Sequence, residues 1–295
     1  MRKSGQRVRT AVAVLTAAVF GLTGCDALGG DAPDEAGLGR QRAEGPAVLW
    51  DRSPASIVAV GDSITRGFDA CGVLVDCPQV SWATGSSPEV NSLAVRLLGA
   101  RATTHSWNVA VSGTAMADLP AQMERAAARG PELVTVMTGA NDACRSSVSA
   151  MTPVDDFRAD FKDAMRTLRQ TLPKAQVYVA SIPNLMRLWS EGRTNPLGKQ
   201  VWKLGICPSM LGDADALDAA ANQRRATVQQ RVMDYNSALA EVCGADEYCR
   251  YDGGAVFDYR FGTAQLSPWD WFHPSKNGQA RLAEIAFRRI TAEKP

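Results

Sequence analysis

Short runs of strand-forming residues alternate with longer helical patterns from residue 51 to the C-terminus. This alternation constrains the fold more than any other feature of the chain. Candidate strands lie at 57–60, 107–111, 133–138, 177–181 and 255–257. Helical patterns cover 90–99, 118–129, 155–171, 223–242 and 277–290. Because strands that alternate with helices form parallel sheets covered on both faces, we expect a three-layer α/β/α sandwich around about five strands.

The segment 185–222 interrupts the alternation. It contains Trp189, Trp202, Gly205, Cys207, Pro208 and Met210, and it is long for a connection between two elements. Long insertions in compact domains often act as lids or as walls of a binding site. The alternative is a surface excursion, tied down by a disulfide, that makes no contact with a substrate. The sequence leaves both interpretations open.

The first 24 residues have the pattern of a signal peptide. A basic segment is followed by an apolar run at 11–22, which is too short to span a bilayer. The run ends in Leu22-Thr23-Gly24-Cys25, which resembles a bacterial lipobox. This resemblance implies cleavage before Cys25, lipidation of its thiol, and anchoring to the outer face of the cytoplasmic membrane. The alternative is an ordinary secretory peptide and release from the cell.

Residues 25–50 contain almost no bulky apolar side chains before Val48, so we predict a flexible tether. The remaining residues, 51–295, have the size of one domain, and we expect a monomer. The chain after residue 24 has 28 basic and 31 acidic residues, which gives a net charge of −3. Because the basic residues form no cluster, we expect no nucleic-acid partner, and contact with a membrane only through Cys25.

Six cysteines remain once Cys25 is set aside. An even number in an exported protein favours disulfides, although six cysteines allow fifteen pairings. Cys71 and Cys77 are close enough in sequence to close a small loop, as are Cys243 and Cys249, which leaves Cys144 to pair with Cys207. The competing interpretation is a zinc site, but the chain has no Cys-x-x-Cys motif and no histidine near these cysteines.

The first candidate strand ends abruptly in Gly61, Asp62 and Ser63. Parallel sheets place their ligand sites at the carboxyl ends of the strands, which makes Ser63 a candidate nucleophile. The alternative is structural, because Asp62 or Ser63 would also serve as the N-cap of the following helix. This motif alone is compatible with both interpretations.

A serine hydroxyl needs a base to accept its proton, and the base needs a group to orient it. Histidine is the usual base near neutral pH, and the chain contains two. His105 lies among polar residues, so we interpret it as a solvated loop residue. His273 follows Asp270 by three residues, so a turn would bring the carboxylate within reach of the imidazole. The same turn could simply begin the last helix and expose both side chains.

Acyl transfer also requires hydrogen-bond donors for the oxyanion that develops during the reaction. Gly113 follows the second candidate strand, and glycine lets a backbone N–H approach a substrate closely. Asn141 lies in Gly-Ala-Asn-Asp after the third candidate strand and offers a side-chain amide. Each segment, taken alone, is also an ordinary turn.

The four segments occur in one order along the chain: Gly-Asp-Ser, the glycine after the second strand, Gly-Ala-Asn-Asp, and Asp-x-x-His-Pro. In this order they resemble the four blocks of the SGNH hydrolases, the GDSL-like lipase and esterase superfamily. The resemblance covers about 57–290, and Ile64 replaces the leucine of Gly-Asp-Ser-Leu. It implies the flavodoxin-like SGNH hydrolase fold, and the six cysteines suggest the secreted bacterial branch with three disulfides.

The resemblance also implies a role for each candidate residue. Ser63 would be the nucleophile, with His273 as its base and Asp270 as the group that orients the base. The oxyanion hole would consist of the N–H groups of Ser63 and Gly113 and the side-chain amide of Asn141. We therefore expect hydrolysis of carboxylic esters, with no metal or organic cofactor.

Three alternatives remain. An α/β-hydrolase would carry Gly-x-Ser-x-Gly, which this chain lacks. A surface-binding lipoprotein that keeps the fold without turnover, or a structural envelope protein, would have no use for an intact Ser63, Asp270 and His273. The substrate stays open among lipids, short acyl esters, acetylated carbohydrates and thioesters. The tryptophans that could line an acyl groove or a sugar platform, or belong to the core, are Trp82, Trp189, Trp202, Trp269 and Trp271.

Overall fold

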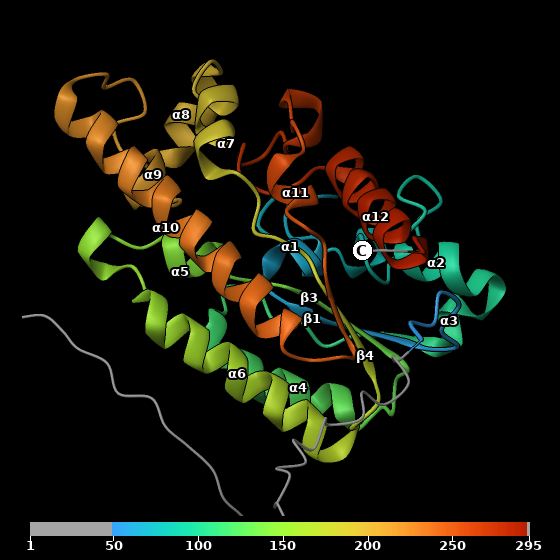
Figure 1. Ribbon diagram of the computed structural model, residues 1–295. Helices are drawn as coiled ribbons and strands as arrows, with labels where there is room; N and C mark the ends of the chain where they lie inside the picture. The colour runs from blue at the N-terminus through green and yellow to red at the C-terminus, as the bar shows by residue number, and fades with distance from the viewer. Residues whose placement is uncertain (1–48, 294–295) are drawn as a thin grey trace, which may run out of the picture. The chain divides into compact units, whose positions relative to one another are not determined.

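The computed structural model describes residues 49–293 (Figure 1). The predicted signal peptide, the lipidation site at Cys25 and nearly all of the predicted tether lie outside these residues. Five strands form one parallel sheet in the order β2-β1-β3-β4-β5. The strands are β1 Ile57–Gly61, β2 Ser106–Asn108, β3 Leu133–Met137, β4 Gln176–Val179 and β5 Cys249–Tyr251.

Helices connect and cover the strands. The α-helices of the described part are α1 Ser63–Arg66, α2 Leu93–Leu98, α3 Ala102–His105, α4 Leu119–Ala127, α5 Ala140–Ala143, α6 Val154–Thr171, α7 Leu185–Gly192, α8 Pro196–Trp202, α9 Pro208–Leu211, α10 Ala219–Gly244, α11 Ala255–Asp258 and α12 Lys276–Thr291. Short 3₁₀ helices cover Pro78–Val80, Gly99–Arg101, Met116–Asp118, Val148–Ala150 and Thr263–Gln265. Within residues 49–293, no helix is both long enough and apolar enough to cross a membrane.

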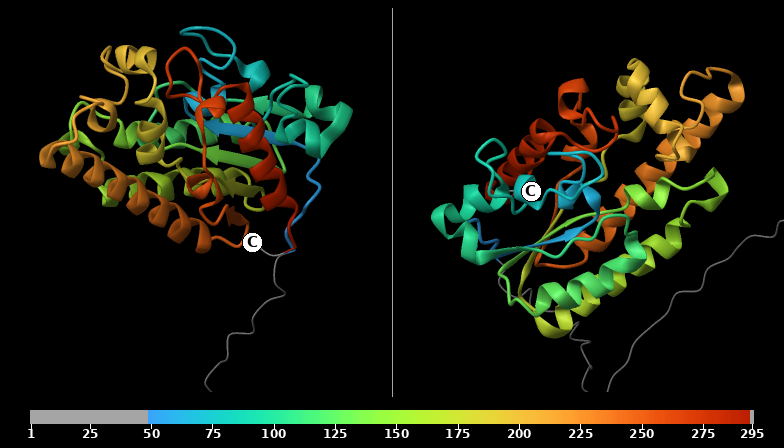
Figure 2. Two further views of the ribbon diagram at one scale, coloured as in Figure 1. Left: turned by 90° about the horizontal axis from the view of Figure 1, so that it is seen from above. Right: turned by 180° about the vertical axis from the view of Figure 1, so that it is seen from behind.

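The side chains of β1 show how the layers form. Successive residues of a strand face opposite sides of the sheet. Val58 and Val60 pack with α4, α6 and α10 on one side, whereas Ile57 and Ala59 pack with α2 and α12 on the other. Helices are seen on both faces of the sheet in Figure 2. The predicted three-layer α/β/α sandwich is therefore confirmed, and the burial of β1 on both faces explains why its sequence is continuously apolar.

The strand order reverses at β1. The chain passes from β1 to β2 on one side and then returns to form β3 on the other side of β1. In doubly wound sheets, ligands bind outside the carboxyl ends of the strands at this reversal. Gly61 and Met137, the last residues of β1 and β3, lie opposite each other in the register. The segments that carry Ser63, Gly113 and Asn141 all leave the sheet at this edge.

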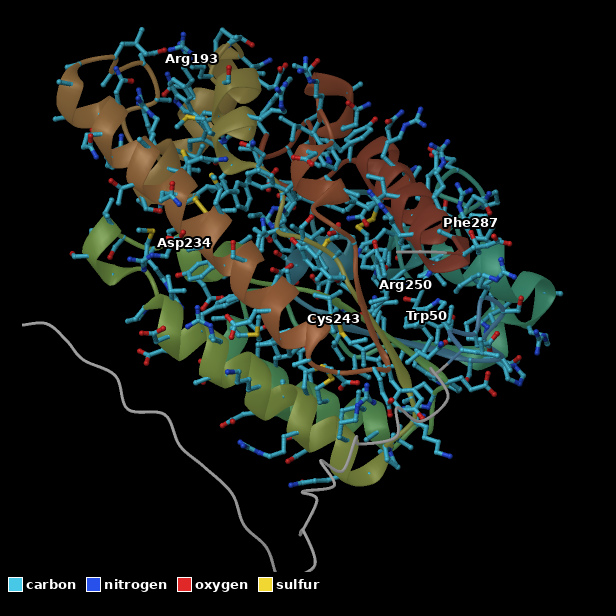
Figure 3. All side chains as sticks on the ribbon, in the orientation of Figure 1. Trp50, Arg193, Asp234, Cys243, Arg250 and Phe287 are labelled. Carbon is cyan, nitrogen blue, oxygen red and sulfur yellow. A yellow bond between two sulfur atoms is a disulfide. The ribbon has the colours of Figure 1, made fainter. Side chains whose placement is uncertain are left out.

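The last predicted strand, at 255–257, is wrong, because these residues begin α11. Asp252 accepts hydrogen bonds from the N–H groups of Gly254 and Val256, at 2.8 and 3.0 Å, and so starts a helical turn. The observed strand β5 was not predicted, because its central residue, Arg250, is charged and interrupts the apolar pattern of a strand. This side chain is buried, donates to carbonyls at the end of α12 and lies 4.5 Å from the centre of the Trp50 ring (Figure 3).

The other strands and helices lie close to their predicted positions. The strands predicted at 107–111 and 177–181 end earlier, at Asn108 and Val179, although Val109 and Val111 still donate to carbonyls of β1. The helix predicted at 90–99 is shorter, and the helix predicted at 223–242 begins earlier, at Ala219. The insertion at 185–222 contains α7, α8 and α9 and the first turn of α10.

Three disulfides join Cys71 to Cys77, Cys144 to Cys207 and Cys243 to Cys249. These are the pairs that the spacing of the cysteines favours. The first closes a loop after α1, and the third ties the end of α10 to β5. The second bridges residues 63 positions apart and fastens the insertion to the end of α5. Three disulfides in one domain are consistent with export.

Candidate active site

Asp62, and not Ser63, caps the helix that follows β1. One carboxylate oxygen of Asp62 accepts a hydrogen bond from the Ile64 N–H at 2.9 Å. Burial raises the pKa of Asp62 to about 7, in opposition to this hydrogen bond. Because the cap is supplied by its neighbour, the hydroxyl of Ser63 is not used by the helix. Ser63 lies at the N-terminus of α1 with 7% of its surface exposed.

The structure brings Ser63, His273 and Asp270 together in that order. Ser63 Oγ lies 2.8 Å from His273 Nε2. On the other side of the ring, His273 Nδ1 is hydrogen-bonded to Asp270 Oδ2. The second oxygen, Asp270 Oδ1, accepts the N–H groups of Phe272 and His273, both at 2.9 Å. The imidazole is thus held with Nε2 toward the serine, as a general base requires.

The charge state of Asp270 follows from these contacts. The carboxylate is 3% exposed, and burial alone would raise its pKa. The hydrogen bond and positive charge of His273, together with two backbone N–H groups, outweigh the burial and lower the pKa of Asp270 below its ordinary value. Asp270 is therefore an anion at neutral pH, able to stabilise a protonated His273.

The turn at 267–273, called here the His273 turn, is closed by its own backbone and supported by the insertion. Ser267 N–H donates to the His273 carbonyl at 2.7 Å, and Trp271 N–H donates to the Ser267 carbonyl at 2.9 Å. From α8, the indole N–H of Trp202 donates to the Asp270 carbonyl at 2.9 Å. The insertion therefore contacts the residue that orients the histidine.

A cavity of about 420 Å³ opens next to Ser63 and His273. Gly113 lies in its wall with φ = 83°, a conformation that favours glycine. A Cβ atom at this position would have no heavy atom within 4 Å, so the backbone faces open space. Asn141, in α5, also lines the cavity and donates one hydrogen of its amide to the Thr114 carbonyl at 2.9 Å. Its second amide hydrogen is left for a ligand.

The insertion forms another part of the cavity wall. Gly205, Ile206 and Cys207 line it, and the Cys144–Cys207 disulfide fastens them to α5. Of the two interpretations of the insertion, the structure therefore favours the wall of a site over a distant excursion. Three further lining residues, Phe68, Ser112 and Phe272, were not predicted from the sequence.

The other candidates lie away from this cavity. His105 is exposed at the end of α3 and bonds to the Thr104 hydroxyl, so it is solvated as expected but is not in a loop. Trp82 and Trp202 are buried in the core. Trp189 and Trp271 pack against the core, and Trp269 is 46% exposed. None of the five tryptophans lines the cavity beside Ser63.

Within residues 49–293, one group of side chains has the composition of a metal site. Asp69, Asp270 and His273 each offer an atom within 4.8 Å of the others. The His273 Nδ1 and the Asp270 carboxylate are, however, already bonded to each other, and Asp270 also accepts two N–H groups. These atoms thus have little capacity left for a cation. Asp69 was not predicted, although it lies only six residues after Ser63.

The GDSL-like Lipase/Acylhydrolase family model matches residues 57–286. The match covers well over half of the sequence, and the chain belongs to this family. Membership indicates ester hydrolysis as the general activity. No curated protein matches the chain in sequence.

Solved structures show a similar fold at low identity. LAE5, an alpha/beta hydrolase enzyme from the metagenome of Lake Arreo, is 18% identical over 83% of this chain and 98% of its own, with a TM-score of 0.50. The extracellular lipase of Streptomyces rimosus is 17% identical over 81% of this chain and 100% of its own, with a TM-score of 0.47. Phospholipase A1 of Streptomyces albidoflavus is 18% identical over 81% of this chain and 100% of its own, with a TM-score of 0.47. The likeness to LAE5 supports the fold.

Proposed function

We propose that this protein hydrolyses carboxylic esters through an acyl-enzyme on Ser63. The observation that carries the proposal is the 2.8 Å contact between Ser63 Oγ and His273 Nε2, with Asp270 on the other ring nitrogen. A serine bonded to an oriented imidazole is the arrangement that activates a hydroxyl as a nucleophile. The cavity of about 420 Å³ beside it leaves room for the acyl group and the leaving alcohol.

The reaction has two halves. Ser63 Oγ attacks the ester carbonyl while His273 Nε2 takes the hydroxyl proton. The oxyanion accepts hydrogen bonds from the N–H groups of Ser63 and Gly113 and from the Asn141 amide. His273 then gives its proton to the leaving alcohol, and the acyl group stays on Ser63. In the second half, His273 activates a water molecule that releases the acid, while Asp270 holds the imidazole in one tautomer throughout.

Lipids, short acyl esters and acetylated carbohydrates are the substrates we consider for this site. A panel of nitrophenyl esters from acetate to palmitate, set beside acetylated xylan and chitin oligomers, will separate them. Because the cavity of about 420 Å³ is bounded by Phe68, Ile206 and Phe272, we infer that the acyl part of the substrate is apolar.

Labelling with a fluorophosphonate probe tests the proposed function. The probe reacts with a serine only when a neighbouring base activates it, so wild type should be labelled once, at Ser63. Ser63→Ala should not be labelled, whereas Ser112→Ala, which removes another hydroxyl of the cavity, should be. A folded wild-type protein that resists the probe would instead indicate the catalytically silent surface-binding lipoprotein.

We also propose that the exported protein is anchored by lipid at Cys25, as the sequence of residues 22–25 suggests. Intact mass measured on a membrane fraction should show a diacylglycerol group on Cys25. Cys25→Ala should abolish this mass and release the protein from the membrane. A wild-type protein without lipid, cleaved at another position, would contradict the anchor and favour secretion.

A further inference from the structure

Asp69 lies at the junction of two segments that are far apart in sequence. It follows α1 and begins the loop closed by the Cys71–Cys77 disulfide. Within this loop, Asp69 N–H donates to the Val75 carbonyl at 3.0 Å, and Asp69 Oδ1 accepts the Leu74 N–H. The Asp69 carbonyl accepts the hydroxyl of Ser267 at 2.7 Å. Asp69 thereby joins the disulfide loop to the His273 turn.

The Asp69 side chain faces the groups that would act on Ser63. It is 1% exposed, and its carboxylate lies within 4.8 Å of both Asp270 and His273. Burial, and then the charge of Asp270, raise the pKa of Asp69 to about 6. A third carboxyl group, that of Asp62, also interacts electrostatically with His273. The charge of Asp142 in turn raises the pKa of Asp62.

The ester hydrolysis outlined above does not use Asp69. Asp270 already orients His273, and it accepts hydrogen bonds from one ring N–H and two backbone N–H groups. A second buried carboxylate beside the first is costly, because the like charges repel each other in a site with little water. The Leu74 N–H holds this carboxylate in place, and its burial beside Asp270 calls for a contribution to the site.

We propose that Asp69 adds a second negative charge beside Asp270, and that this charge sets the pH range in which His273 accepts a proton. This inference rests on the proposed function. A negative charge near an imidazole stabilises its protonated form, so His273 loses its proton at a higher pH when Asp69 is ionised. Only the neutral imidazole can accept the proton of Ser63. Removing the charge should therefore extend activity to lower pH.

Asp69→Asn tests the charge while keeping the shape. The amide oxygen can still accept the Leu74 N–H. We expect kcat at alkaline pH to remain near that of wild type, and the acid limb of kcat/KM to move to lower pH by roughly 1 unit. Asp69→Ala also loses the hydrogen bond from Leu74, and its acid limb should move in the same direction.

Asp252→Asn is the matched control. Asp252 is fully buried, and it accepts hydrogen bonds from Ser181, Gly254 and Val256 beyond the end of β5. Its replacement should lower the free energy of unfolding and leave the acid limb of the kcat/KM profile unchanged. An equal shift in this control, or no shift in Asp69→Asn, would overturn the proposal. If Asp69→Asn does not fold, Asp69→Ser provides a second neutral side chain with the same expected direction.

An NMR titration separates this inference from the proposed function. Because the chain has two histidines, isotope-labelled imidazole gives two signals, and His105→Gln assigns them. The titration of His273 should move to lower pH in Asp69→Asn, while that of His105 stays in place. This measurement needs no substrate. If fluorophosphonate failed to label Ser63 and the His273 titration still moved, the enzymatic proposal alone would fail.

Discussion

Ser63→Ala is expected to reduce the kcat for ester hydrolysis by roughly 10⁴- to 10⁶-fold, to near the uncatalysed background. The variant removes the hydroxyl that contacts His273 Nε2, and with it the atom that would carry the acyl group. The fold should persist, because Asp62 caps α1 and the sheet and disulfides are unaffected. Steady-state kinetics on a nitrophenyl ester measures the loss of kcat, and circular dichroism on the same sample shows whether the fold persists.

His273→Ala should be almost as damaging, because Ser63 would keep its hydroxyl but lose its base. The Ser63→Ala/His273→Ala double variant should lose little more, since residues that act as one unit are not additive. His105→Ala is the control, because His105 is exposed and remote from the cavity. If His105→Ala abolished hydrolysis while His273→Ala left it intact, the assignment of the base would be wrong.

The second large effect concerns Asn141. Asn141→Ala leaves nucleophile and base in place and removes one donor to the oxyanion. We expect kcat to fall by roughly 10²- to 10³-fold, about 2.7–4 kcal/mol in transition-state stabilisation, with KM little changed. Loss in kcat without loss of binding is the signature of an interaction made only in the transition state.

Asn108→Ala controls for the loss of an ordinary amide. Asn108 ends β2, and its side chain donates to the Thr65 carbonyl at 2.9 Å, but it does not line the cavity. Its replacement should lower the melting temperature and leave kcat nearly unchanged. If Asn141→Ala instead raised KM at constant kcat, Asn141 would bind substrate and would not stabilise the oxyanion.

The central strands and the residues at their ends could be predicted because local sequence determines them. Buried parallel strands require continuous apolar runs, and β1 and β3 have them. The positions of Ser63, Gly113 and Asn141 then follow from the rule that sites lie at the carboxyl ends of such strands. Asp270 and His273 could be paired because they lie only three positions apart, within reach of each other in a turn.

The features that escaped prediction depend on contacts between distant segments. Strand β5 contains a buried arginine, which is tolerated only because carbonyls at the end of α12 accept its hydrogen bonds. The closeness of Asp69 to Asp270 depends on the folding of the loop after α1 against the His273 turn. The bond from Trp202 to Asp270 spans 68 residues. No local periodicity encodes such contacts.

The hydrogen bond between Trp202 and the Asp270 carbonyl has a consequence for protein engineering. Loops around a rigid scaffold are the usual targets when an enzyme is altered to accept another substrate, because they can be exchanged without disturbing the chemistry. In this chain the exchangeable segment also supports the turn that carries Asp270 and His273, and three of its residues line the cavity, namely Gly205, Ile206 and Cys207. A transplanted insertion would have to supply an equivalent indole at Trp202, so substrate preference and catalytic competence can only be redesigned together.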